Sequence, residues 1–208
     1  MTSLQAMFGA AVSASILALQ VSTWAAGSPL EMIRSTVNSA IAVLQSPAYQ
    51  GATHRRERMA KVQGIILPHF DTQELAARAL GCYWHQRTEE EKREFVRLFT
   101  ALIEQTYSGT LDRYGKHVQV VFDQERTDGD FAEVDTRILA PNQTQPISIN
   151  YFLHEMKGQW LIYDVQIENI SMVRNYRTQF SRILSTSSYA DLVRRIKDKL
   201  QELDTATS

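Results

Sequence analysis

The spacing of apolar residues along this 208-residue chain changes twice, and these two changes restrict the fold more than any other feature. From about residue 29 to residue 114, apolar side chains recur every three or four positions, as in amphipathic helices. After Gly115 the spacing becomes two, as in β-strands, and from about residue 171 the helical spacing returns. Helices, then strands, then helices predict an α+β fold in one domain.

Local capping signals predict where the helices begin. A polar capping residue followed three positions later by an acid occurs at Ser28, Asp71, Thr88 and Ser188. Proline or glycine predicts several of the ends, because neither residue continues a helix well. We expect helices over residues 29–45, 53–66, 72–80, 88–114 and 171–184, and a last one beginning at 188.

The fourth of these helices carries a broad apolar stripe. Its members recur at spacings of three and four and are Phe95, Leu98, Phe99, Leu102, Ile103, Tyr107, Leu111 and Tyr114. A stripe of this width predicts that the helix lies against a large apolar surface.

Four strands are expected, over residues 116–124, 131–140, 146–155 and 159–169, forming an antiparallel meander. We predict three-residue loops that contain Gly129 and Gly158, because two-residue loops would place the apolar residues of paired strands on opposite faces. The predicted apolar face comprises Val118, Val120, Phe122, Ala132, Val134, Ile138, Ile147, Ile149, Tyr151, Leu153, Leu161, Tyr163, Val165 and Ile167. The other face is expected to carry Phe152, Trp160, Ile162 and Asp164, with Asp164 opposite Asn150.

Residues 1–26 are interpreted as a secretion signal. Residues 6–19 form an apolar run of the length of a signal-peptide core, and small residues before Ser28 suit a cleavage site. The run is short for a membrane span, and the usual basic residues before it are missing, so an uncleaved anchor and a start further upstream remain alternatives. The mature domain would comprise residues 27–208.

Composition excludes several classes of function. The net charge of −1 leaves no excess of cations to neutralise many phosphates, so we expect no nucleic-acid partner. The single cysteine, Cys82, excludes an internal disulfide, and the five histidines lack the spacing of a metal site. No nucleophile elbow or phosphate-binding glycine loop occurs. We expect neither a metal nor a cofactor.

Two features leave functional alternatives open. Asp164 is the best candidate for a buried acid or base, although a structural hydrogen bond is the preferred interpretation. The basic run at residues 54–61 is interpreted as a solvated helix face, with docking to an acidic partner or an anionic lipid surface as the alternative.

Three segments together resemble the MlaC, or toluene-tolerance, family. The run "QWLIYDVQIENISMVRNYRTQF" is similar to its C-terminal motif, "EEKREFVRLFTALIEQTYSGTLDRY" to its long helix, and "LPHFDTQELAARALGCYW" to its phenylalanine-aspartate segment. The resemblance covers most of the mature chain in order and spacing. Asn169 stands where the family has glycine, and asparagine tolerates the left-handed conformation better than most residues.

The resemblance implies a periplasmic phospholipid carrier, without enzymatic activity, whose helices pack on a curved four-stranded antiparallel sheet around an apolar cavity, partly like the cone of NTF2-like proteins. Its partners would be an inner-membrane ABC transporter complex with its substrate-binding subunit and an outer-membrane lipoprotein-porin complex, and its role would be to maintain outer-membrane lipid asymmetry. We expect the lipid to contact Leu102, Tyr107, Leu111, Tyr151, Leu153, Tyr163, Val165, Ile167, Met172 and Tyr176. Arg174 and Arg177 would face the head group or a partner. A hopanoid-associated carrier of the same family and an enzyme with a cone-shaped cavity are the alternatives.

Overall fold

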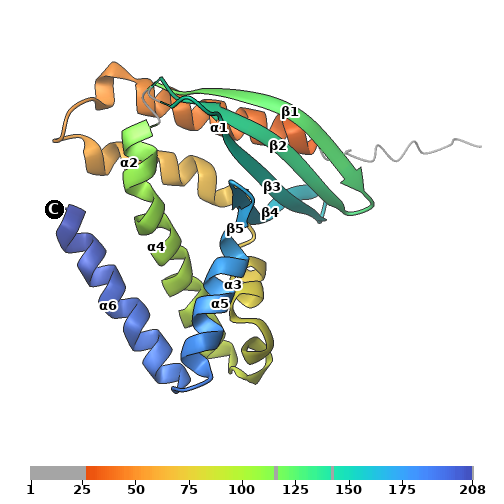
Figure 1. The fold of residues 1–208 in the computed structure, drawn as a ribbon, viewed down its shortest axis with the longest axis vertical. Coiled ribbons are helices and arrows are strands. Elements are labelled where there is room, and N and C mark those ends of the chain that lie inside the picture. The colour runs from red at the N-terminus through yellow and green to blue at the C-terminus, as the bar shows by residue number, and fades with distance from the viewer. Residues whose placement is uncertain (1–26, 115–116, 142, 208) are drawn as a thin grey trace, which may run out of the picture.

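The computed structural model describes residues 27–114, 117–141 and 143–207 (Figure 1). The expected secretion signal at residues 1–26 and the predicted helix stop at Gly115 lie outside the described residues. Within the described part, no helix is both long enough and apolar enough to cross a bilayer.

The order of elements is helices, then a sheet, then two helices, as expected. The first group is α1 (Pro29–Gln45), η1 (Pro47–Tyr49), α2 (Arg55–Ile66), η2 (Leu67–His69), α3 (Thr72–Leu80), η3 (Gly81–Gln86) and α4 (Glu89–Tyr114). The sheet contains β1 (Gln119–Asp128), β2 (Phe131–Leu139), β3 (Ile147–Met156), β4 (Gln159–Ile167) and β5 (Ile170–Ser171). The last helices are α5 (Met172–Leu184) and α6 (Tyr189–Thr207).

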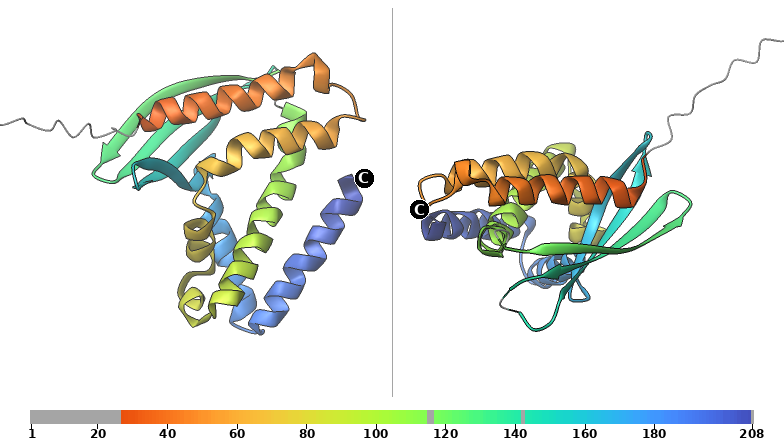
Figure 2. Two further views of the ribbon diagram at one scale, coloured as in Figure 1. Left: turned by 180° about the vertical axis from the view of Figure 1, so that it is seen from behind. Right: turned by 90° about the horizontal axis from the view of Figure 1, so that it is seen from above.

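The molecule has two parts joined by α4 (Figures 1 and 2). The sheet, α1 and α2 form one part, and α3, α5, α6 and most of α4 form the other. Helix α1 packs on β1, β2 and α2, while α4 packs on α6 and α3 packs on α5. The second part has an aromatic core in which Phe95, Phe99 and Phe180 are buried against one another.

Three predicted helix starts are confirmed by their hydrogen bonds. The carboxylate of Asp71 accepts from the backbone N–H of Glu74 at 2.8 Å. Thr88 and Glu91 exchange hydrogen bonds, since Thr88 Oγ1 accepts from Glu91 N at 3.2 Å and Glu91 accepts from Thr88 N at 2.9 Å. Ser188 caps α6 through the N–H of residue 191 at 3.1 Å. These caps are local, which explains why the sequence predicts them.

Helix α1 begins differently from the prediction. The Ser28 side chain makes no capping bond to its own helix, and instead its hydroxyl donates to Glu125 Oε2 at 2.5 Å. The same carboxylate oxygen accepts from the Leu30 N–H at 2.7 Å. Glu125 lies on β1, so a carboxylate far along the chain replaces the local cap and complements the positive helix end.

The sheet is a meander in the order β1-β2-β3-β4-β5, so it has five strands where four were predicted. The difference is β5, which pairs with the end of β4 through a turn at Glu168 and Asn169. Both turn residues have positive φ, 49° and 64°, so Asn169 takes the left-handed conformation that the family glycine would take.

The loop between β1 and β2 has two residues, so the predicted three-residue loop is wrong. Asp128 pairs with Phe131, which leaves Gly129 and Asp130 in the turn. A bulge at Asp123 adds one residue to β1 between its pairs with Thr136 and Asp135. A two-residue loop alone would turn the apolar residues of β1 to the opposite face from those of β2. The extra residue in the bulge reverses the alternation of side chains once more, so the apolar residues of both strands share one face as predicted.

The loop between β3 and β4 also has two residues, Lys157 and Gly158, with φ of 53° and 80°. The compensating bulge lies within β4, at Tyr163. After the bulge, the residues predicted to face the core do so. Before the bulge, the residues predicted to face the core lie on the outer face, and those predicted to lie outside face the core. Leu161 and Tyr163 were therefore wrongly assigned to the core face, whereas Trp160 and Ile162 are buried there, at 9% and 2% exposure.

The bulge also changes the neighbours of Asp164, which pairs with Phe152 and not with Asn150 as predicted. The preferred interpretation of Asp164 as a structural hydrogen-bond acceptor is confirmed. Its carboxylate accepts hydrogen bonds from the backbone N–H groups of Val165 at 2.8 Å and Val173 at 3.1 Å.

Candidate functional site

An apolar cavity of about 400 Å³ lies between the inner face of the sheet and the helices α1, α2 and α4. Its wall is built from Ile33, Val37, Ala40, Ile41 and Leu44 of α1; Met59, Val62, Gln63 and Ile66 of α2; Thr100, Ile103, Glu104, Tyr107, Thr110 and Leu111 of α4; and Val120, Ile138, Ile147, Ile149, Tyr151, Ile162, Val165 and Ile167 of the sheet. Thr36, Leu67, Phe70, Thr72, Leu75, Val118, Gln143 and Met172 complete it.

The two periodicities of the sequence produce this wall. The lining residues of α1 are three or four positions apart and so occupy one helix face. Those of β3, at positions 147, 149 and 151, alternate and so occupy one sheet face. A concave apolar space bounded by two such faces is the usual form of a small-ligand site.

Six of the predicted lipid-contact residues line this cavity. They are Tyr107, Leu111, Tyr151, Val165, Ile167 and Met172. They come from α4, from β3 and β4, and from the first residue of α5, so the structure brings together residues that are far apart in the chain.

The other four lie elsewhere. Leu102 and Leu153 are packed in the hydrophobic core, at 6% and 0% exposure. Tyr176 packs edge-on against Phe99, with ring centroids 5.0 Å apart. Tyr163 lies on the outer face of the sheet because of the bulge, where the Arg78 guanidinium lies 4.2 Å from its ring centroid.

Arg174 and Arg177 do not line the cavity. Both are exposed on α5, on the part of the molecule opposite the sheet (Figure 1). The Arg177 side chain covers Gly81, where an added Cβ would lie 2.9 Å from Arg177 Nε.

Two parts of the wall were not predicted from the sequence. The first is the inner face of α1, whose spacing of three and four was available in the sequence. The second is the polar edge formed by Gln63 of α2 and Glu104 of α4, which no local pattern indicates. Among the described residues Glu104 makes no hydrogen bond or ion pair.

The apolar surroundings shift the pKa values of the ionisable groups in the wall. Burial raises the pKa of Tyr151 to about 12, and it raises the pKa of Tyr107 as well. Burial also raises the pKa of Glu104 above its usual range. The two phenols therefore remain neutral near pH 7, because their charged forms would lose hydration.

The basic run at residues 54–61 serves the fold. Arg58 is 1% exposed and its Nε donates to Asp112 Oδ1 at 3.0 Å, while Arg55 pairs with the other oxygen of Asp112 at 3.2 Å. These pairs attach α2 to the C-terminal part of α4. Of the basic residues in this run, Arg56 and Lys61 lie on the exposed side of α2, so the alternative interpretation as a docking patch applies to these two.

Neither the histidines nor Cys82 form a reactive cluster. In the part of the chain that the structure describes, no group of three or more metal-ligating side chains comes together. His154 Nε2 lies 3.0 Å from the carboxylate of Asp71, which connects the outer face of the sheet to the start of α3. Cys82 is exposed.

Comparison with known proteins agrees with this architecture. The family model described as MlaC protein matches residues 34–198. The intermembrane phospholipid transport system binding protein MlaC of Haemophilus influenzae is 23% identical over 144 residues, which cover 68% of this chain and 67% of that protein. The solved structure of a phospholipid-binding protein from Ralstonia solanacearum in complex with a phospholipid has a TM-score of 0.72 and 20% identity, covering 84% of this chain and 98% of that chain.

Proposed function

The chain belongs to the MlaC family, and on that premise we propose that it is a periplasmic phospholipid-binding transport protein that carries lipid between complexes of the outer and inner membranes. This role would maintain the lipid asymmetry of the outer membrane. Export to the periplasm would depend on the secretion signal expected at residues 1–26.

The observation that carries the proposal is the apolar cavity of about 400 Å³. Protein interiors are normally packed as densely as organic crystals, so an apolar space of this size is room for a ligand, whose atoms would make dispersion contacts with the wall. Each methylene group removed from water gains about 0.8 kcal/mol, so an acyl chain is strongly favoured there over the aqueous periplasm.

The partner surface is proposed to lie on α5. This helix contains Arg174, Arg177 and Arg182 and no acidic residue, and all three arginines are exposed. A surface of one charge sign attracts a partner of opposite sign and accelerates its association. We assign this face to acidic surfaces on the inner-membrane ABC transporter complex with its substrate-binding subunit and on the outer-membrane lipoprotein-porin complex.

Catalysis is not part of the proposed function. The ionisable residues along the described cavity wall are Glu104, Tyr107 and Tyr151. Burial raises the pKa of both phenols, so both stay protonated near pH 7 and neither serves as a general base. A single carboxylate without an opposed acid or base does not form the pair that general acid–base chemistry uses.

The test is organic extraction of the mature protein purified from its native periplasm, followed by mass spectrometry. We expect close to one phospholipid per protein chain. A hopanoid in its place would select the alternative carrier of the same family. A protein that carries no lipid and takes none up from phospholipid vesicles would contradict the carrier function altogether.

A further inference from the structure

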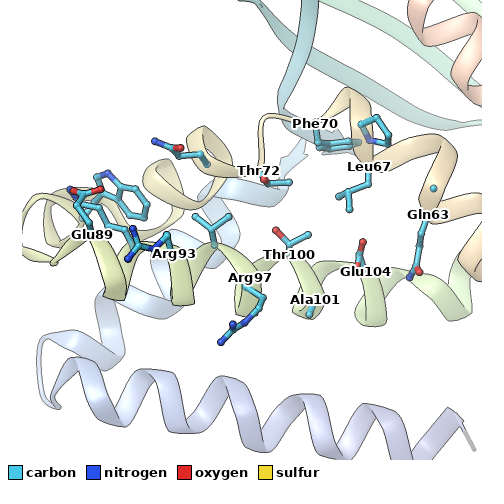
Figure 3. A pocket seen from close by; sticks show the side chains of 16 residues that line it. Gln63, Leu67, Phe70, Thr72, Glu89, Arg93, Arg97, Thr100, Ala101 and Glu104 are labelled. Atoms are coloured by element: carbon cyan, nitrogen blue, oxygen red, sulfur yellow. The ribbon is translucent and has the colours of Figure 1, made fainter.

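The outer face of the sheet carries an aromatic and apolar surface, which we call the outer patch. Its members are Phe131 of β2, Phe152 and Met156 of β3, and Leu161 and Tyr163 of β4. Phe131 is 51% exposed and Met156 is 42% exposed. None of the five lines the cavity or the groove of about 900 Å³ that adjoins it along α4 (Figure 3). The outer patch is therefore a surface separate from the lipid site.

Tyr163 lies at the centre of the outer patch and is held there from two sides. Its ring centroid is 6.2 Å from that of Phe131 and 6.4 Å from that of Phe152. The Arg78 guanidinium lies 4.2 Å from the same ring, and Glu74 holds that guanidinium at 2.7 Å. Tyrosine and arginine are among the residue types that most often dominate the binding energy of protein interfaces.

The bulge of β4 places Tyr163 on this face. Strict alternation would have turned the ring toward the core, and the extra residue turns it outward. A large ring left at the surface gives up stabilisation that burial would provide. Contiguous apolar patches that remain exposed mark sites of interaction with other molecules.

The charge around the outer patch is negative. Apart from the pair of Asp71 with His154, carboxylates exceed cations there by three: Glu74, Asp128, Asp130, Glu133, Asp135 and Asp164 against Arg78, Arg126 and Lys157. Arg126 is shared between two of the carboxylates, since its Nη2 lies 3.0 Å from Glu133 and 2.8 Å from Asp135. One cation therefore neutralises only part of the acidic charge on β2.

The phenol of Tyr163 responds to these charges. Burial raises its pKa, and of the neighbouring charged groups Arg78 lowers that pKa whereas Asp164, Glu133 and Glu74 raise it. Carboxylates from β4, β2 and α3 therefore act together at the centre of the outer patch.

Rings surrounded by carboxylates suit one kind of occupant. An apolar side chain packs on the rings, and lysine or arginine beside it meets the carboxylates. An anionic membrane surface is repelled by the same charge. Helix α5 differs, because its Arg174, Arg177 and Arg182 are accompanied by no acidic residue.

We propose that the outer patch is a docking site for a partner protein that presents an apolar side chain flanked by lysine or arginine. Phe131 and Tyr163 contact the apolar side chain, and the surrounding carboxylates attract its cations. The proposal goes beyond the carrier function and does not depend on it. It gives the molecule a second docking surface, opposite in charge to α5.

The first experiment places the photoreactive residue p-benzoylphenylalanine at position 131 of the full chain in its native cells. Mass spectrometry of the linked peptides then identifies the segment that lies on the outer patch. We expect a segment of another protein in which lysine or arginine adjoins an apolar residue. The same photoprobe at position 170 is the control, because Ile170 is 64% exposed on the same sheet but outside the outer patch.

The second experiment titrates the purified protein with a fluorescent peptide of alternating lysine and leucine. Phe131→Ser should weaken binding about fivefold or more, whereas Ile170→Ser should bind like the parent. Binding should also weaken as salt rises, and a peptide of alternating glutamate and leucine should bind far less. Both replaced side chains are exposed, so melting temperatures near the parental value will confirm that the variants are folded.

The proposal requires both results. It is overturned if position 131 gives no link beyond that of position 170, or if the linked segment contains no cation. A link to α5 of another copy of the chain would show self-association and not a partner protein. Equal peptide affinities for the parent and Phe131→Ser, or for the two peptides, would exclude the outer patch as a docking site of this chemistry.

Discussion

The hydroxyl of Ser171 donates a hydrogen bond to Asp164 Oδ2 across 2.5 Å, and the same hydroxyl oxygen accepts from the Arg174 N–H at 2.9 Å. One buried serine thus caps α5 and fixes its first turn to strand β4. Since Val165 and Met172 line the cavity on either side of this joint, the hydrogen bonds set the position of one end of the cavity wall.

We expect Ser171→Ala to lower the free energy of unfolding by about 1 to 2 kcal/mol, because a helix cap and a hydrogen-bond partner of the partly buried Asp164 carboxylate are lost together. Chemical denaturation measures the change. Ser185→Ala is the control, since its side chain is exposed and its hydroxyl donates, among the residues that the structure describes, only to the Arg182 carbonyl at 2.9 Å. Equal effects of the two substitutions would contradict the role assigned to the joint.

The buried cation of α2 should be the most sensitive charged residue of the fold. Arg58→Ala leaves the Asp112 carboxylate and the carbonyls of Tyr49 and Gly51 without their buried donor, so we expect a loss of about 3 to 5 kcal/mol in unfolding free energy. Lys61→Ala on the same helix removes an exposed pair to Glu57 at 4.0 Å and should change stability by less than about 1 kcal/mol. Denaturant titration of both variants tests the difference.

A polar group inside the cavity should reduce lipid content. Val165→Gln places an unpaired amide on the wall at a cost of about 1 to 3 kcal/mol, which a domain of this size tolerates, and we expect less co-purified lipid per folded chain. Val121→Gln makes the same change on β1 outside the cavity and should leave the lipid content unchanged. Quantitative mass spectrometry of the two variants decides, and parental lipid content in Val165→Gln would show that this wall does not contact lipid.

Glu104 gives the lipid-free protein a specific pH dependence. Because burial raises its pKa in the folded state, the folded chain binds more protons than the unfolded chain between the normal and the raised pKa. Stability therefore falls as pH rises through that window, and above it the ionised carboxylate destabilises the fold. Glu104→Gln should melt at a higher temperature than the parent at pH 7 but not at about pH 4 or below.

The control for this measurement is the exposed Glu90, which lies on the same helix. Its replacement by Gln should shift the melting temperature by similar small amounts at both pH values. A gain for Glu104→Gln that persists unchanged under acidic conditions would mean that packing, and not the charge, is responsible.

The α5 arginines should affect transfer and not stability. We expect the Arg174→Ala, Arg177→Ala variant to melt like the parent and to deliver lipid more slowly to partner complexes. The transfer rate of the parent should fall as salt rises, because the Debye length shortens from about 10 Å at 0.1 M to about 3 Å at 1 M. Transfer by the double variant at the parental rate in low salt would show that these arginines are not part of the partner surface.

The sequence by itself determined the helices and the order of the layers. The caps at Asp71, Thr88 and Ser188 involve atoms within one helical turn, so their chemistry is complete in the local sequence. The change of apolar spacing from helical to alternating, and back, likewise depends only on neighbours along the chain. Both signals predicted an α+β chain with a long amphipathic helix, and the structure has that form.

Only the tertiary structure decided which side chains reach the cavity. The sequence contains no local signal for the bulge at Tyr163, because a bulge depends on how two strands pair. This one extra residue reverses which side chains of the first half of β4 face the core. The cap of α1 by Glu125 and the meeting of α2 with Glu104 at the cavity edge depend equally on packing between distant segments. Local sequence therefore determines the elements, whereas the relative positions of those elements determine the site.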